Sequence, residues 1–191
     1  MLSKGFLLVL SSPSGGGKTT LCRMILKNNS SIVYSISATT RPMRKNEKNG
    51  CDYYFLKEDE FKKKEEEGYF AEVAKVYNYY YGTPLEMIKK SIEKGIIVLM
   101  DLDVKGAKSI MKKFPDAVTI FIKPPSMEIL KERLMKRNTD RENVIQIRLK
   151  NAEAEMKVAE KFKYQIINED LNRTYKAINI IIKNEIKRRN K

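Results

Sequence analysis

Residues 6–20 read Phe-Leu-Leu-Val-Leu-Ser-Ser-Pro-Ser-Gly-Gly-Gly-Lys-Thr-Thr. The apolar run 6–10 is short and uninterrupted, which is the pattern of a strand covered on both faces. A helix is expected to follow over about 19–28. The glycines let backbone N–H groups turn towards one point, and the N-terminus of a helix adds positive potential there. The order of strand, glycine loop, Lys-Thr and helix therefore predicts a loop that holds phosphate groups.

Two side chains of this loop suit a nucleotide. Lys18 would reach the β and γ phosphates, and the Thr19 hydroxyl is placed to bind Mg²⁺. Ser12 stands where the pattern G-x-x-x-x-G-K-[ST] has its first glycine. A flexible strand-to-helix turn is the alternative interpretation that the loop alone leaves open.

Strand and helix alternate along much of the remaining chain. Apolar runs at 96–100, 118–122 and 164–167 predict three further strands, and a helix is expected over about 171–188. This alternation is typical of a parallel α/β fold.

Two segments break the alternation. Residues 35–83 contain short aromatic strands near 53–56 and 70–77 and a charged helix over 58–67, so they predict a small antiparallel lobe inserted into the core. Thr83 and Glu86 predict a capping box that opens the next helix, with Pro84 at its first position. Residues 135–154 are basic and poor in apolar side chains, begin a helix with a capping box over 139–142, and are interpreted as a mobile lid.

Composition excludes several classes of protein. The 191 residues suit one domain, carry a net charge of +14, and contain no histidine and two cysteines in no metal-ligand spacing. Serine–histidine catalysis and histidine-bound metals are therefore excluded, and the charge favours anionic partners. The absence of a leader-like start or a long apolar run predicts a soluble cytoplasmic protein with no membrane partner.

The inserted lobe carries candidate ligand contacts. Arg41 and Arg44 lie three residues apart around a proline, so both can project towards one anion, although two solvated arginines would give the same spacing. The tyrosines of the lobe also fit an aromatic mini-core. Glu72 shares an apolar strand face with Phe70, Ala74 and Val76 if the strand alternates regularly, so it needs a donor partner. Guanine offers N1–H and N2–H₂ side by side, and a salt bridge to lysine is an equally good explanation.

The chain resembles the guanylate kinase family. The matching strings occur in the family's order over about residues 5–187: SSPSGGGKTT (11–20), SATTRPMR (37–44), NGCDYYF (49–55), YYGT (80–83), DLDVKGA (101–107), IKPPS (122–126), RLMKR (133–137), IRL (147–149) and INEDL (167–171). The resemblance implies a P-loop NTPase fold: a parallel sheet flanked by helices, with an inserted small mixed α/β lobe that binds GMP and a helical lid. It divides one domain into a core (about 1–34, 84–134 and 155–191), the lobe (35–83) and the lid (135–154).

The resemblance also implies the reaction and its residues. ATP would phosphorylate GMP, and also dGMP, in purine nucleotide metabolism, with Mg²⁺ as cofactor. The implied catalytic residues are Lys18, Arg41, Arg137 and Arg148. The implied ATP contacts are Ser14, Gly15, Gly16, Gly17, Lys18, Thr19, Thr20, Arg133, Arg137 and Asn168, of which Asn168 would border the adenine. The implied GMP contacts are Ser37, Arg41, Arg44, Tyr53, Glu72, Tyr81, Thr83 and Asp101, and the metal would be held by Thr19, with Asp101 acting on it indirectly.

Three residues depart from the family pattern: Ser12, Lys105 in place of glutamine, and Asn138 in place of glycine. Three other functions are compatible with parts of the sequence: a non-catalytic binding module of this fold, a nucleic-acid-binding protein and a kinase for another nucleoside monophosphate. The intact Lys18-Thr19 pair, the dispersed lysines and the Glu72–Thr83 pair argue against them in turn. We therefore predict ATP and GMP as partners and no nucleic acid, and the sequence leaves the oligomeric state open.

Overall fold

The structure of the chain is a computed structural model that describes residues 5–76, 78–136 and 142–190. Its core is a five-stranded sheet in the order β2-β7-β1-β8-β9, and every paired neighbour is parallel. The strands are β1 (Leu7–Ser11), β2 (Ile32–Tyr34), β7 (Ile97–Asp101), β8 (Val118–Lys123) and β9 (Tyr164–Ile167). The predicted parallel α/β class is confirmed, with β1 at the centre of the sheet.

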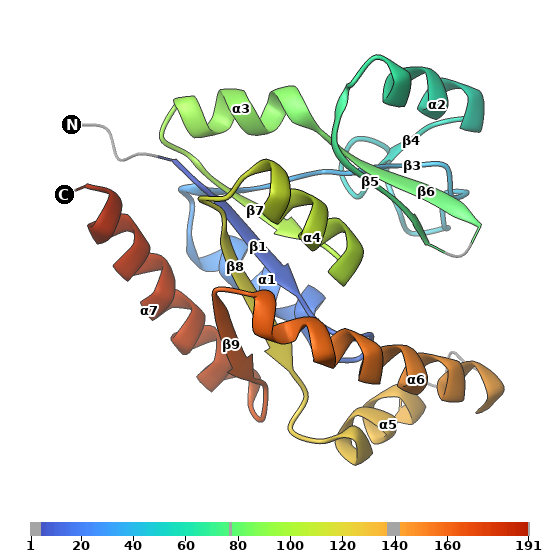
Figure 1. Cartoon of the computed structure of the whole chain (residues 1–191), viewed down its shortest axis with the longest axis vertical. Coiled ribbons are helices and arrows are strands. Elements are labelled where there is room, and N and C mark those ends of the chain that lie inside the picture. The colour runs from blue at the N-terminus through green and yellow to red at the C-terminus, as the bar shows by residue number, and fades with distance from the viewer. Residues whose placement is uncertain (1–4, 77, 137–141, 191) are drawn as a thin grey trace.

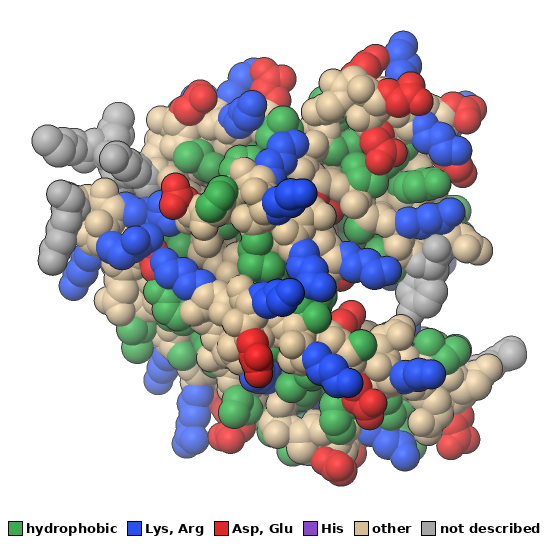
Figure 2. Space-filling model, viewed as in Figure 1, with side chains coloured by type: hydrophobic (Ala, Val, Ile, Leu, Met, Phe, Trp, Pro, Cys, Tyr) green, Lys and Arg blue, Asp and Glu red, His purple; other side chains and the backbone are tan. Residues whose placement is uncertain are grey.

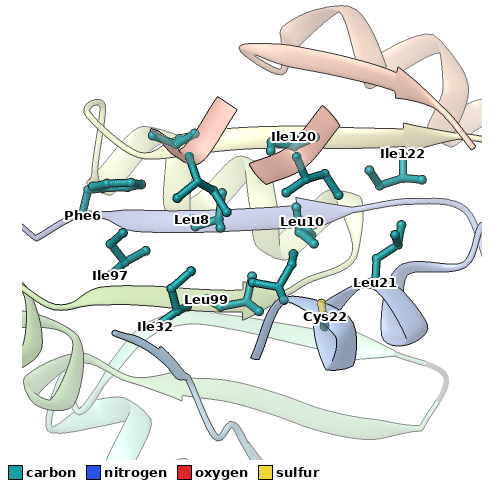
Figure 3. Packing of buried hydrophobic residues seen from close by; sticks show 14 residues of the cluster. Phe6, Leu8, Leu10, Leu21, Cys22, Ile32, Ile97, Leu99, Ile120 and Ile122 are labelled. Atoms are coloured by element: carbon teal, nitrogen blue, oxygen red, sulfur yellow. The ribbon is translucent and has the colours of Figure 1, made fainter. Parts of the chain in front are cut away.

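Helices cover both faces of this sheet (Figure 1). α1 (Lys18–Asn28) and α7 (Leu171–Arg189) pack on one face, and α3 (Leu85–Glu93) and α4 (Val104–Lys113) pack on the other. Alternate residues of β1 serve the two sides: Leu8 and Leu10 belong to the cluster in Figure 3, while Leu7 and Val9 join the opposite cluster. The uninterrupted apolar run is thus explained by burial on both faces.

A second sheet of four strands forms the inserted segment, in the order β4-β3-β6-β5. It consists of β3 (Ala38–Thr39), β4 (Tyr54–Phe55), β5 (Phe70–Val76) and β6 (Tyr79–Pro84), with α2 (Glu58–Glu66) packed on it through Phe61. β3 and β4 are parallel, whereas the other pairs are antiparallel. The expectation of a purely antiparallel lobe is wrong, because a long connection rather than a hairpin returns the chain to β4.

The last helices are α5 (Met127–Lys136) and α6 (Glu142–Val158), followed by the 3₁₀ turn η1 (Ala159–Lys161). Residues 135–154 are poor in apolar side chains, as noted from the sequence, but α6 does bury two of them: Ile145 and Ala152 pack with Leu130 and Leu134 of α5. The capping box predicted at 139–142 falls mostly on residues outside the described ranges. Within those ranges, no helix is both long and apolar enough to cross a membrane.

Thr83 does not cap α3, contrary to the sequence expectation. It is the fifth residue of β6, and the N-cap of α3 is Pro84, with no side-chain cap hydrogen bond. The Thr83 hydroxyl instead donates to Glu72 on the neighbouring strand. The Thr83 hydroxyl therefore binds the buried Glu72 carboxylate and not the first backbone N–H groups of α3.

Candidate active site

The glycine loop between β1 and α1 has the backbone of an anion-binding turn. Gly15 and Gly17 adopt φ values of +93° and +95°, in the left-handed region that favours glycine. Gly16 N–H donates to Pro13 O at 2.9 Å and closes the turn. A Cβ at position 16 would lie 2.9 Å from the Cβ of buried Ser12, so serine is accommodated at the departure position because residue 16 has no side chain.

Lys18, the first residue of α1, connects this loop to the end of β7. Its Nζ lies 2.7 Å from Asp101 Oδ1 and donates to Leu102 O at 2.7 Å. The side chains of Lys18 and Asp101 are 17% and 15% exposed, so the pair is accessible from the surface yet largely shielded. Thr19 and Thr20 follow on the exposed side of the first helical turn.

Glu72 is the buried acid of the second sheet. It lies opposite Thr83 in the pairing of β5 with β6, and its Oε1 accepts a hydrogen bond from Thr83 Oγ1 at 2.8 Å. Because the Thr83 proton is used there, Ser37 Oγ, 3.4 Å from Thr83 Oγ1, is the donor of the next link. Glu72 is 6% exposed and Thr83 is fully buried. Three predicted base-reading residues therefore form one chain of polar side chains.

The environment of Glu72 makes its ionisation costly. Burial raises the pKa of Glu72 from 4.5 to about 7, the Thr83 hydrogen bond partly lowers it, and the nearby charge of Asp103 raises it again. Among the described residues no lysine takes part, so the salt bridge considered from the sequence is not formed. A carboxylate without a cation gains most from a ligand that donates to it.

Regular alternation predicted that Phe70 shares a strand face with Glu72, and this prediction is wrong. A register shift lies between Phe70 and Glu72, so Ala71 is the additional residue of a bulge. Phe70 consequently packs with Val73 in the cluster under α2, rather than sharing a face with Glu72. The bulge separates the small lobe core from the polar chain.

Arg41, Tyr53 and Tyr81 lie together at the other end of the lobe. The Arg41 guanidinium is 5.5 Å from the centre of the Tyr53 ring, and the rings of Tyr53 and Tyr81 make an edge contact with centres 6.0 Å apart. Burial raises the pKa of Tyr53, and the neighbouring Tyr81 and Asp101 raise it further. Arg44 follows Arg41 by three residues in the same loop and is exposed. The mini-core expected as an alternative for the tyrosines is formed elsewhere, by Tyr80 against Phe61.

Glu47 was missed by sequence reasoning. Its Oε1 lies 2.6 Å from Arg41 Nη2, and its Oε2 accepts from the Arg44 backbone N–H at 2.8 Å. The hydrogen bond from Arg41 lowers the pKa of Glu47 and raises that of Arg41. A glutamate three residues after Arg44 can accept a hydrogen bond from the Arg44 backbone N–H, but this spacing is a weak signal. Nothing else in residues 41–47 distinguishes Glu47 from the other glutamates of the chain.

The first turn of α4 joins the two groups of residues. At one end of the segment 101–106, Asp101 and the Leu102 carbonyl contact Lys18. At the other end, a Cβ at Gly106 would lie 3.0 Å from Glu72 Oε2, and Asp103 caps the helix by accepting from Gly106 N–H at 2.7 Å. Six residues therefore span from the glycine loop to the buried acid.

Two arginines that were predicted as hinge and lid residues contact the glycine loop or the residue beneath it. Arg148 of α6 has its Nη1 3.1 Å from Ser14 Oγ, and Arg133 donates to Asn168 O at 2.8 Å. Asn168 is buried beneath the loop and donates to Gly16 O. Arg137 and Asn138 lie outside the described residues. Figure 2 shows the surface hollowed between the four-stranded sheet and α6, with Lys and Arg side chains beside the hollow.

Known proteins resemble this chain over most of its length. A sequence model of the family "Guanylate kinase" matches residues 4–185. The chain is 45% identical over 179 residues to a guanylate kinase of Caldanaerobacter subterraneus subsp. tengcongensis, covering 94% of this chain and 87% of that protein. It is 43% identical over 188 residues to a guanylate kinase of Rickettsia bellii, covering 98% of both. The crystal structure of guanylate kinase from Anaplasma phagocytophilum superposes with a TM-score of 0.79 at 37% identity, covering 96% of this chain and 87% of that one.

Proposed function

The chain belongs to the guanylate kinase family of nucleoside monophosphate kinases, and on that premise we propose that it transfers the γ-phosphoryl group of ATP to GMP. The products are ADP and GDP, and dGMP is proposed as a second acceptor. The proposal rests on the placement of segment 101–106. Asp101, at one end of it, pairs with Lys18, and Gly106, at the other end, lies next to Glu72. A segment of six residues, from the end of β7 to the first turn of α4, thus separates the proposed donor site from the proposed acceptor site.

Guanine recognition is assigned to Glu72, Thr83 and Ser37. An ionised Glu72 can accept N1–H and N2–H₂ of guanine with its two oxygens, and adenine has no such pair of donors. The hydrogen bond from Thr83 holds the carboxylate in place before the base arrives. Because the carboxylate is buried without a cation, binding a double donor relieves its desolvation, and binding another base does not.

The GMP phosphate is assigned to Arg41, Arg44, Tyr53 and Tyr81. Two guanidinium groups and two phenol hydroxyls offer charge-assisted hydrogen bonds to an anion. Tyr53 and Glu47 both contact Arg41, so the guanidinium is oriented before substrate binds. Asp101, also predicted as a GMP contact, lies at the end of β7 and is paired with Lys18.

Phosphoryl transfer needs alignment and charge neutralisation more than a covalent nucleophile. An oxygen of the GMP phosphate attacks the γ-phosphorus, and the bond to the oxygen bridging to ADP breaks. Backbone N–H groups of residues 15–17 and the Lys18 ammonium neutralise charge on the donor phosphates. Arg148, which contacts Ser14, brings a guanidinium from α6 to the same loop, and Arg137 is proposed to add a second.

Mg²⁺ is proposed as the cofactor, because the oxygen donors at this position suit it. The Thr19 hydroxyl and the Asp101 carboxylate are hard ligands of the kind that Mg²⁺ prefers. No cluster of three acidic or thiol side chains suited to a metal occurs in the described part of the chain, which agrees with an ion held mainly by substrate phosphates and water. When bound, the ion would neutralise charge on the β and γ phosphates.

The division of the chain is part of the proposal. Residues 35–83 would form the GMP lobe, 135–154 the lid, and the remainder the core. Closure of the GMP lobe and the lid over the substrates would exclude water that competes for the phosphoryl group. A cytoplasmic location is also proposed, supported by two free cysteines, one of them exposed.

The test is ADP release from MgATP with GMP, AMP, UMP and CMP as separate acceptors. Release that requires GMP, and is at least 100-fold slower with the other acceptors, is expected from the Glu72 geometry. Equal rates with AMP and GMP would refute the assignment of base recognition, and no release with any acceptor would refute the proposed reaction.

A further inference from the structure

Asn168 follows β9 and lies beneath the glycine loop with only 1% of its surface exposed. Its Nδ2 donates to Gly16 O at 2.8 Å, and its Oδ1 accepts from Thr174 Oγ1 at 3.0 Å. Its backbone N–H donates to Lys123 O at 2.8 Å, and its carbonyl accepts from Arg133 at 2.8 Å. All four polar atoms of this residue are therefore engaged inside the protein.

The contact with Gly16 O fixes the orientation of one peptide group of the loop. In a trans peptide the C=O of one residue and the N–H of the next point in opposite directions. An amide that holds the Gly16 carbonyl from below therefore directs the Gly17 N–H to the opposite side, the side on which the loop binds phosphate. Gly17 also has a φ of +95°, a left-handed conformation that glycine adopts without strain.

Thr174 decides which end of the Asn168 amide faces the loop. An amide has a donor end and an acceptor end of similar shape, and hydrogen bonds decide between them. The Thr174 hydroxyl is buried, lies in the first turn of α7, and donates to the oxygen end. The nitrogen end is thereby turned towards Gly16. With the opposite orientation two carbonyl oxygens would face each other.

Packing restricts the loop at the same place. A Cβ at position 17 would lie 2.4 Å from Asn168 Nδ2, so the amide occupies the space next to the glycine. On the other flank, a Cβ at Gly15 would lie 3.0 Å from a methyl group of Leu130 in α5. The peptide between residues 16 and 17 is thus supported by β9 and α7 rather than by contacts within the loop.

We propose that Asn168 and Thr174 are positioning residues of the phosphate loop: Thr174 orients the Asn168 amide, and the amide holds the Gly16 carbonyl so that the Gly17 N–H faces the donor phosphates. The proposal rests on the proposed phosphate-binding function of the loop. It gives Asn168 a duty distinct from contact with adenine, and it gives Thr174 a duty that the family strings did not suggest.

The experiment compares Thr174→Val, which removes the hydroxyl at nearly constant volume, with Thr174→Ser, which keeps it. Inhibition constants against ATP are measured for ADP and for inorganic tripolyphosphate, which has no base. Removing one buried hydrogen bond is expected to raise both constants by the same factor of about five to ten in Thr174→Val. The KM for GMP should stay within twofold, and Thr174→Ser should recover most of the loss.

A second readout does not depend on turnover. In ¹H–¹⁵N spectra of the wild-type chain, tripolyphosphate should shift the Gly17 amide resonance strongly, and in Thr174→Val this shift should be reduced at saturation. Asn168→Asp, which removes the donor but keeps the size, should behave like Thr174→Val, and urea unfolding midpoints verify that each variant is folded.

Three outcomes would overturn the proposal. If ADP binding falls while tripolyphosphate binding does not, the residues act on the base and not on the loop. If both ligands bind Thr174→Val as they bind the wild type, the hydroxyl does not position the amide. If the wild-type chain binds neither ligand, the proposed function fails as well, and Asn168 and Thr174 do not position a phosphate-binding loop.

Discussion

Replacing Glu72 by glutamine should change the pH dependence of stability. The folded state holds the Glu72 proton with a pKa of about 7, against 4.5 for an ordinary glutamate. Between pH 4.5 and 7 the folded chain therefore binds more protons at this site than the unfolded chain, so the free energy of unfolding falls as the pH rises through that window. Above pH 7 the loss is complete and corresponds to ~3 kcal/mol.

Glutamine keeps an oxygen for the Thr83 hydroxyl but does not ionise. The unfolding free energy of Glu72→Gln minus that of the wild type should therefore rise by about 2 to 3 kcal/mol between pH 5 and pH 8. Any constant cost of the new NH₂ group cancels in this comparison. For a chain of this size the change is a relative shift of about 1 M in the urea midpoint, measured without nucleotide.

The matched control is Glu86→Gln on the exposed face of α3. Glu86 pairs with Lys90 at 2.8 Å, and that hydrogen bond lowers its pKa. Its replacement should give no rise in relative stability over the same interval. If the stability difference between Glu72→Gln and the wild type does not change with pH, ionising the Glu72 carboxyl in the folded chain is not costly, and guanine binding would bring it no relief.

The same group should control GMP binding. About one-tenth of Glu72 is ionised at pH 6, so the wild-type KM for GMP should be about tenfold higher there than at pH 8. The GMP phosphate titrates in the same way with either protein, but Glu72→Gln has no carboxyl to titrate, so its KM for GMP should vary less with pH than that of the wild type. At pH 8 the KM of Glu72→Gln should be about 100-fold higher than that of the wild type, because the charged acceptor of the base is lost. An equal loss of affinity for ATP would mean that Glu72 has a structural role only.

Three further predictions concern the other charged side chains. Lys18→Ala should lower kcat by about 100- to 1,000-fold while the Kd for GMP stays unchanged, and a kcat within tenfold of wild type would contradict its role. Glu47→Gln should raise the KM for GMP about tenfold by loosening Arg41, whereas tighter GMP binding would mean that Glu47 competes with the phosphate. Glu185 is 2% exposed, and its carboxylate lies 2.7 Å from Lys163 Nζ, so Glu185→Gln should lower the free energy of unfolding by about 2 kcal/mol. The loss would be measured from urea midpoints, with kcat unchanged, and an unchanged midpoint would contradict this.

The core of the fold was predictable because its signals are local. The apolar run at 6–10 implies a doubly covered strand wherever it is placed, and Gly15 and Gly17 have the left-handed backbone that three consecutive glycines permit. The helix expected over 58–67 forms as α2, and Gly68, with a φ of +70°, follows its end. These features depend on neighbours in sequence, so a sequence pattern describes them adequately.

The errors occur where a distant group competes for a local one. The hydroxyl of Thr83 was expected to cap α3, but the buried Glu72 on the next strand binds it. Regular alternation placed Phe70 beside Glu72, and a bulge that no residue pattern announces moved it to the other face. Asn168 belongs to a string of the family resemblance, yet its fully buried amide depends on Thr174 and Gly16, contacts formed only when α7 packs near the loop.

Transfer of label from [γ-³²P]ATP to GMP would show whether the two sites act together. We propose that segment 101–106 holds them so that the γ-phosphoryl group passes to the GMP phosphate and not to water. At saturating GMP, nearly all label should appear in GDP and almost none in inorganic phosphate, and the flux should fall sharply in Lys18→Ala. Label released mainly as inorganic phosphate, or GDP formation unaffected by Lys18→Ala, would contradict this proposal.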